Sequence, residues 1–177
     1  MQRIATTVIG LVGEPARACA QALDRAANIR VELPDPSAPP LDRAVAAWQA
    51  ATSTQAPYLV HDADPLAVVA DAWVRRYDQQ GPPGELELAV GDTLTRWRAR
   101  SIELPDYYLL LDPASWDPTR RHWYLGLLHR AAPARVVPAA TTTDQLQSRI
   151  ATLASGRWWP DLDRLLADID RVVPDRL

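Results

Sequence analysis

The chain has 177 residues, 47% of them hydrophobic, which is enough to bury one sizeable core, and we expect a single domain over residues 1–177. Its formal net charge of −3 gives no overall attraction to nucleic acid or to an anionic membrane. All 19 basic residues are arginines, so chemistry that needs a lysine, such as a Schiff base or a phosphate-binding ammonium group, is excluded.

The cysteine and histidine content argues against disulfides and metal centres. Cys19 is the single cysteine and cannot form an internal disulfide, and the three histidines are too scattered for a zinc site. The threonine-broken start of the chain predicts no signal peptide, and no apolar run approaches the ~20 residues that cross a bilayer. We therefore predict a cytoplasmic protein with no metal site and no membrane partner.

Short apolar segments alternate with helix-forming segments along the chain. Strands are predicted over 4–9, 29–33, 57–61, 106–112 and 135–138. Helices are predicted over 14–27, 41–52, 65–79, 85–101, 118–131, 142–154 and 160–172. This alternation predicts an α/β fold with a parallel sheet between two helical layers. Ligands of such sheets bind beyond the carboxyl ends of the strands, so we expect the functional residues just after each strand.

Two helical segments raise questions about partners. Leucines and valines recur at helical spacing over 160–172, which predicts a helix that packs on its own domain or forms a subunit interface. Arg96, Arg98 and Arg100 surround Trp97, but alternate residues of a helix point in different directions. With the acidic net charge, this spacing argues against a nucleic-acid partner.

Three segments that follow or contain predicted strands carry a more specific pattern. They read G-L-V-G-E-P-A-R at 10–17, Y-L-V-H-D-A-D-P-L at 58–66 and P-D-Y-Y-L-L-L-D-P-A-S-W-D-P-T-R-R at 105–121. In this order they resemble the phosphate loop, the Asp-Thr-Asp strand end and the lid of the P-loop nucleoside kinase-like family, most closely its ribosylnicotinamide-kinase-like branch. The resemblance implies a P-loop NTPase fold with five parallel strands in the order 2-3-1-4-5 and a lid-like segment over about 113–131.

The first of these segments departs from the phosphate-loop pattern at the positions that bind phosphate and magnesium. Gly10 and Gly13 match glycines of the family, so we expect the backbone shape of the loop to be kept. Pro15, however, stands in place of a glycine and removes an N–H donor. Ala16 replaces the phosphate-binding lysine, and Arg17 replaces the hydroxyl that would hold magnesium. Losing one such contribution typically costs ~10²–10³ in rate, so we expect phosphoryl transfer to be lost.

The resemblance also implies roles for two aspartates and for Arg17. Asp62 would be the catalytic base if the chain were active, and a structural residue otherwise. Asp64 would face substrate or metal, or would cap the helix predicted to begin at Pro65. Arg17 would bind an anion, or would pair with a neighbouring carboxylate and seal the site; the candidate partners are Glu14, Asp62 and Asp112.

The third segment supplies the remaining candidates for ligand binding. Asp112 ends the best strand in the chain, and Trp116 would stack on a ligand ring or pack in the lid. Arg120 and Arg121 resemble lid arginines that touch phosphates, and as neighbours on a helix only one of them is expected to face the site.

Taken together, these residues predict a catalytically inactive P-loop kinase-like protein that binds a partner protein, a second copy of itself or a nucleotide-like ligand. The alternative is an active kinase or phosphate-handling enzyme that uses Arg17 with Arg120 or Arg121 in place of lysine. ATP and magnesium are expected as cofactors only under that alternative.

Overall fold

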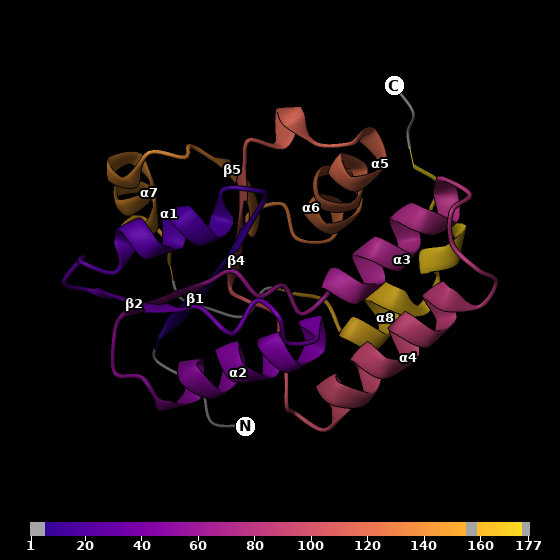
Figure 1. Ribbon diagram of the computed structural model, residues 1–177, viewed down its shortest axis with the longest axis horizontal. Helices are drawn as coiled ribbons and strands as arrows, with labels where there is room; N and C mark the ends of the chain where they lie inside the picture. Colours follow the sequence, from indigo (N-terminus) through magenta and orange to yellow (C-terminus); the bar gives the residue numbers. More distant parts are fainter. Residues whose placement is uncertain (1–5, 155–158, 175–177) are drawn as a thin grey trace.

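A computed structural model describes residues 6–154 and 159–174 of the chain. Within them, five parallel strands form one sheet in the order β2-β3-β1-β4-β5 (Figure 1). The strands are β1 (Thr7–Val12), β2 (Ile29–Glu32), β3 (Tyr58–His61), β4 (Tyr107–Leu111) and β5 (Val136–Ala139). The predicted parallel sheet is confirmed, and its strand order is the order that the resemblance implied.

The interior strand β4 shows that the sheet is covered on both sides. All five of its residues are buried, as expected for a continuous apolar run in a parallel sheet. It pairs with β1 on one side and with β5 on the other. Because side chains alternate along a strand, Leu109 and Leu111 belong to one apolar cluster while Tyr108 and Leu110 belong to another.

Helices cover both faces of the sheet. The longer ones are α1 (Ala16–Leu23), α2 (Pro40–Ser53), α3 (Ala67–Tyr77), α4 (Glu85–Arg98), α7 (Thr143–Ile150) and α8 (Leu162–Ala167). Figure 1 shows α1 and α7 on one side of the strands and α2 on the other. The cluster around Leu109 includes residues of α1 and α7, whereas the cluster around Tyr108 includes residues of α3 and α8. A three-layer arrangement follows from this division of the core.

The predicted helix over 118–131 is continuous but changes its hydrogen bonding along its length. It consists of α5 (Pro118–Arg121), a π-helix (His122–Leu128) and α6 (His129–Ala131). A short 3₁₀ turn, Pro113–Ser115, precedes it. The lid-like segment over about 113–131 is thus largely helical, and the buried Trp123 and Tyr124 tie it to the core.

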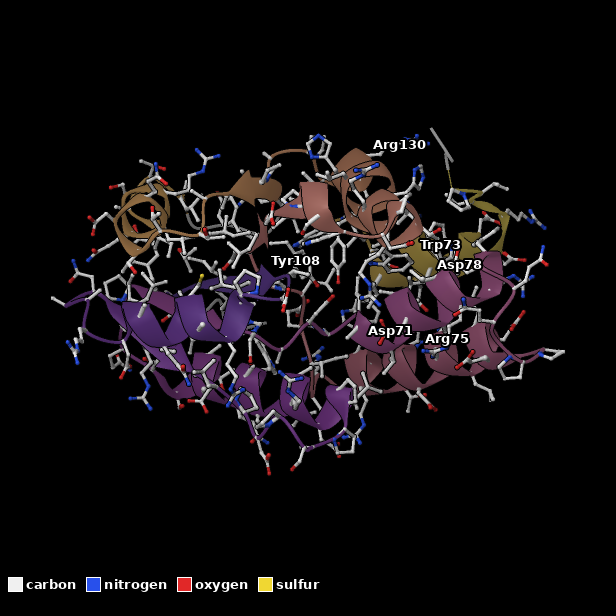
Figure 2. All side chains as sticks on the ribbon, turned by 45° about the horizontal axis from the view of Figure 1, so that its top comes forward. Asp71, Trp73, Arg75, Asp78, Tyr108 and Arg130 are labelled. Carbon is white, nitrogen blue, oxygen red and sulfur yellow. The ribbon has the colours of Figure 1, made fainter. Side chains whose placement is uncertain are left out.

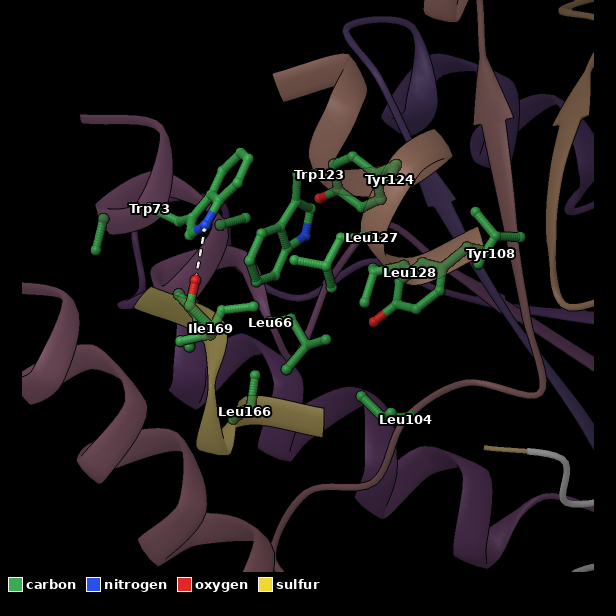
Figure 3. Packing of buried hydrophobic residues seen from close by; sticks show 14 of the residues in the cluster. Leu66, Trp73, Leu104, Tyr108, Trp123, Tyr124, Leu127, Leu128, Leu166 and Ile169 are labelled. Atoms are coloured by element: carbon green, nitrogen blue, oxygen red, sulfur yellow. Dashed lines mark hydrogen bonds between the residues drawn. The ribbon is translucent and has the colours of Figure 1, made fainter. Parts of the chain in front are cut away.

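The C-terminal helix packs on its own domain. Leu162, Leu166 and Ile169 are buried in the same cluster as Trp73. The indole N–H of Trp73 donates a hydrogen bond to the carbonyl oxygen of Ile169 at 3.1 Å (Figure 3). The helix is shorter than predicted over 160–172: α8 ends at Ala167 and a 3₁₀ turn follows over Ile169–Arg171.

The first strand also differs from prediction. The strand was expected over 4–9, of which residues 4 and 5 lie outside the described part of the chain; the observed strand is Thr7–Val12 and ends three residues later than predicted. Ladder pairing with β4 explains the shift, because Leu11 pairs with Leu109 and Val12 with Leu110. No helix in the described part of the chain combines the length and the apolar character that a membrane crossing would need.

Candidate functional site

The turn between β1 and α1 is short and closed. Gly13 has a φ of +127°, and a Cβ atom there would lie 2.6 Å from the carbonyl oxygen of Leu111, so only glycine fits. Glu14 and Pro15 complete the turn, and α1 begins at Ala16. The N–H of Ala16 donates to the carbonyl oxygen of Gly13 at 3.1 Å, so it is used within the turn.

This geometry corrects the expectation that residues 10–17 keep the backbone shape of a phosphate loop. Because β1 runs through Val12, Gly10 is a buried strand residue rather than a loop residue. A Cβ atom at Gly10 would lie 3.2 Å from Cγ of Pro105, so this glycine allows close packing and has no room for a ligand. Gly10 is therefore removed from the candidate ligand-binding residues, and Gly13 is a turn glycine.

Arg17 forms an ion pair that closes the region in front of this turn. Its Nη1 lies 2.9 Å from Oδ2 of Asp62 and 3.1 Å from the carbonyl oxygen of Pro34. The second carboxylate oxygen of Asp62 lies 3.1 Å from Nη2 of Arg43 on α2. The Asp62 side chain is only 6% exposed and lies between the two guanidinium groups: Oδ2 accepts a hydrogen bond from Arg17, whereas Oδ1 is close to Arg43 without a hydrogen bond. Of the three partners considered for Arg17, the structure selects Asp62.

Asp64 lies deeper, in a hydrogen-bonded cluster with two tyrosines. The hydroxyl of Tyr108 donates to Oδ1 at 2.7 Å, and the hydroxyl of Tyr124 donates to Oδ2 at 2.6 Å. The N–H of Leu66 also donates to Oδ1, at 2.8 Å. Burial raises the pKa of the Asp64 carboxyl above its ordinary value, although these hydrogen bonds act to lower it. Burial and the nearby Asp64 carboxylate raise the pKa of both tyrosines well above the usual range.

The position of Asp64 bears on the capping hypothesis. Its carboxylate accepts the N–H of Leu66 in the turn before the helix, but Leu66 is itself the N-cap of α3, which begins at Ala67 rather than at Pro65, and no described side chain caps this helix, so the predicted capping role is not observed. Sequence reasoning missed Tyr108 and Tyr124 as its partners, because they lie 44 and 60 residues away along the chain.

His61, the last residue of β3, is buried beside this region. The N–H of Ala63 donates to its Nδ1 at 3.2 Å, which leaves the proton of the neutral ring on Nε2. Burial lowers the pKa of His61 to about 4, despite the nearby Asp62 carboxylate, which acts to raise it. The ring is therefore neutral near pH 7.

Trp116 packs in the lid, over the β1–α1 turn. A Cβ atom at Gly13 would lie 3.3 Å from its ring, and its indole N–H donates to the carbonyl oxygen of Leu111 at 3.1 Å. The ring also stands edge-on to Tyr124, with centroids 5.4 Å apart. Of the two roles considered for this tryptophan, packing is the one observed. Asp112 takes a left-handed conformation with a φ of +49° and turns the chain into the lid.

The two lid arginines point in different directions, as their adjacency predicted. Arg120 pairs with Asp71 of α3 at 2.5 Å. Arg121 instead lines a cavity on the outer face of the helix, together with His122 and Arg130. Figure 2 shows Arg130 at the outer margin of the molecule, well apart from Asp71 and Tyr108. Arg121 is therefore not part of the site at the carboxyl ends of the strands.

A cavity of about 630 Å³ remains open beside the β1–α1 turn. We call it the α7 cavity; it is lined by Glu14, Pro15, Asp112, Ala139, Ala140, Thr141, Thr142 and Gln145. Its volume lies within the range of small-molecule sites. Its charged lining residues are both acidic, and its threonine hydroxyls and glutamine amide supply neutral hydrogen-bonding groups. Such a lining suits an uncharged or cationic ligand and opposes a phosphate group.

Among the described residues, no group of three or more histidine, cysteine, aspartate or glutamate side chains could hold a metal ion. No family model, curated protein or solved structure matches the chain. The candidate site is therefore defined by its own geometry: a short closed turn, the Arg17–Asp62–Arg43 bridge and the α7 cavity.

Proposed function

We propose that this chain is a catalytically inactive protein of the P-loop kinase-like class that binds an uncharged or cationic, nucleoside-sized molecule in the α7 cavity. The observation that carries the proposal is the ion pair between Arg17 and Asp62. In the alignment with the kinase loop, Arg17 occupies the position of the metal-binding hydroxyl and Asp62 that of the catalytic base. Each neutralises the other, so neither group is available for phosphoryl transfer.

The turn itself supports the same proposal. A phosphate-binding loop presents several backbone N–H groups to an anion. Here the N–H of Ala16 is bonded to Gly13, Pro15 has no N–H, and Trp116 packs against Gly13. A triphosphate would meet the Glu14 carboxylate and an indole ring, and it would lack the N–H donors of positions 15 and 16.

The alternative of an active kinase would require arginines in place of lysine. Arg17 is paired with Asp62, and Arg120 is paired with Asp71. Both would have to leave a carboxylate to reach a phosphate, at the cost of exposing a partly buried charge. We therefore favour ligand binding without turnover.

Thermal unfolding tests the proposal with three probes: adenosine as an uncharged ligand, nicotinamide riboside as a cationic ligand, and ATP with and without magnesium. At about ten times its Kd, a ligand of the native state stabilises it by ~1.4 kcal/mol, or ~3–5 °C in a chain of this length. We expect such a shift from at least one of the two nucleosides and none from ATP.

A cavity-filling variant identifies the site. Ala140→Trp should remove the nucleoside shift, because the indole would occupy the α7 cavity. Ala134→Trp is the matched control, since Ala134 is exposed and lies outside the cavity lining. A shift by ATP and magnesium with formation of ADP and a phosphorylated nucleoside would contradict the proposal, as would a nucleoside shift that survives Ala140→Trp.

A further inference from the structure

The helix over 118–131 carries a second, oppositely charged surface. Its outer face forms a cavity of about 510 Å³, lined by Arg121, His122, Gly126, His129 and Arg130 among others. The lining positions follow one another by one, three or four residues, so they share one face of the helix. We call this surface the basic groove.

The two histidine rings of the basic groove are held in place. A Cβ atom at Gly126 would lie 2.6 Å from Cε1 of His122, so the glycine lets this ring lie flat against the helix. The same ring stacks on Trp73, with centroids 6.1 Å apart and planes inclined by 13°. The Nδ1 of His129 donates to the carbonyl oxygen of Val136 at 3.0 Å. The groove therefore has a preformed wall.

The arginines of the basic groove carry charge that no acidic side chain of its described lining balances. Arg121 and Arg130 take part in no ion pair with any residue that the structure describes, whereas their neighbour Arg120 is paired with Asp71. The groove lining includes no acidic residue among those described. This contrasts with the α7 cavity, whose charged residues, Glu14 and Asp112, are both acidic.

The hydrogen bonding of the helix changes at the same place. The groove lies along the π-helix His122–Leu128. Such π-helical turns are rare in proteins overall, but those that occur are often found at functional sites. Two guanidinium groups can each present a pair of N–H donors to the oxygens of a phosphate. We propose that the basic groove binds a small phosphate-bearing anion.

The size and charge of the partner follow from the rest of the molecule. The basic residues of the groove are confined to positions 121–130, and the chain as a whole has a net charge of −3. An extended polyanion would reach past this segment, where the described lining of the groove offers no further arginine, and would gain little from the acidic chain as a whole. A compact anion such as pyrophosphate or a phosphomonoester places its charge within the groove alone.

Isothermal titration of the full chain with pyrophosphate, at fixed pH and ionic strength, tests the proposal. We expect one saturable site that is weakened about tenfold by Arg121→Gln or by Arg130→Gln, and further by both together. Arg25→Gln is the matched control, because Arg25 is exposed and lies outside the groove. This variant should leave the affinity within about twofold of the parent.

The inference would be overturned by the absence of saturable binding, by an equal loss in Arg25→Gln, or by tighter groove-dependent binding of a 12-nucleotide single strand than of pyrophosphate. A repeat titration with Ala140→Trp separates this site from the α7 cavity. Pyrophosphate affinity should be unchanged in that variant, and a loss there would place the anion in the α7 cavity and contradict the groove proposal.

Discussion

The bridge at Asp62 gives the sharpest quantitative prediction. Exposed ion pairs contribute about 0.2–1 kcal/mol, and breaking a fully buried pair costs about 3–5 kcal/mol. Asp62 is 6% exposed, Arg17 34% and Arg43 22%, so the bridge lies between these limits. We expect Asp62→Asn to cost about 2–3 kcal/mol, or ~5–10 °C, because it leaves two guanidinium groups without their shared carboxylate. Arg17→Met should cost about 1 kcal/mol, since Arg43 still balances Asp62.

A double-mutant cycle isolates the interaction. Urea unfolding of Arg17→Met, Asp62→Asn and the double variant should give a coupling energy of about 1–2 kcal/mol. The control cycle uses Arg96→Met and Asp42→Asn, an ion pair with the same 2.9 Å separation but with side chains 44% and 50% exposed. Its coupling should be below about 0.5 kcal/mol. Equal coupling in the two cycles would refute the argument that burial makes the Asp62 bridge strong.

Three further predictions concern burial and backbone conformation. Because the pKa of His61 is about 4 in the folded chain and near 6.5 when unfolded, the unfolded state binds the extra proton as pH falls. Stability should therefore drop by up to ~3 kcal/mol between about pH 6.5 and 4, and His61→Gln should flatten this dependence in urea titrations at each pH. Gly13→Ala should lower the free energy of unfolding by more than ~2 kcal/mol, because the new Cβ atom would meet a backbone oxygen. Gly84→Ala should lower it by only ~1 kcal/mol in the same assay, because Gly84 has a φ of +82° but nothing within 4 Å of the new Cβ atom. Asp64→Asn should change the free energy of unfolding by less than ~1 kcal/mol, since it removes a buried charge and keeps a hydrogen-bond acceptor. Asp64→Ala should lower it by ~2–3 kcal/mol, because the hydroxyls of both tyrosines lose their acceptor. Equal losses in the two variants would contradict this reasoning.

Much of the fold could be predicted because its elements carry local signals. The run Y-Y-L-L-L of β4 is apolar on both faces, which only a covered parallel strand requires. The strand order came from the resemblance, since periodicity contains no information about which strands are neighbours. The position of β1 was mispredicted because Gly10 indicated a loop, whereas its missing side chain makes room for Pro105.

The candidate site was predicted in part, and the limit was distance along the chain. Asp62 was one of three carboxylates considered as partners for Arg17, because residues that follow the strands of one sheet gather at the edge where the carboxyl ends lie, but sequence alone did not choose among them. The second guanidinium, Arg43, lies on the helix before β3 and gave no signal of its own. The π-helix was also unforeseen, because the sequence over 122–128 is compatible with an ordinary α-helix.

The length of the β1–α1 connection has a consequence for any attempt to build an active enzyme on this chain. Three residues separate the last ladder residue, Val12, from the first helical residue, Ala16. A backbone that wraps an anion needs a longer path, so Ala16→Lys and Arg17→Ser would place the right side chains on a connection too short to use them. Added residues after Val12, rather than exchanged ones, would be the first requirement for such an engineered gain of activity.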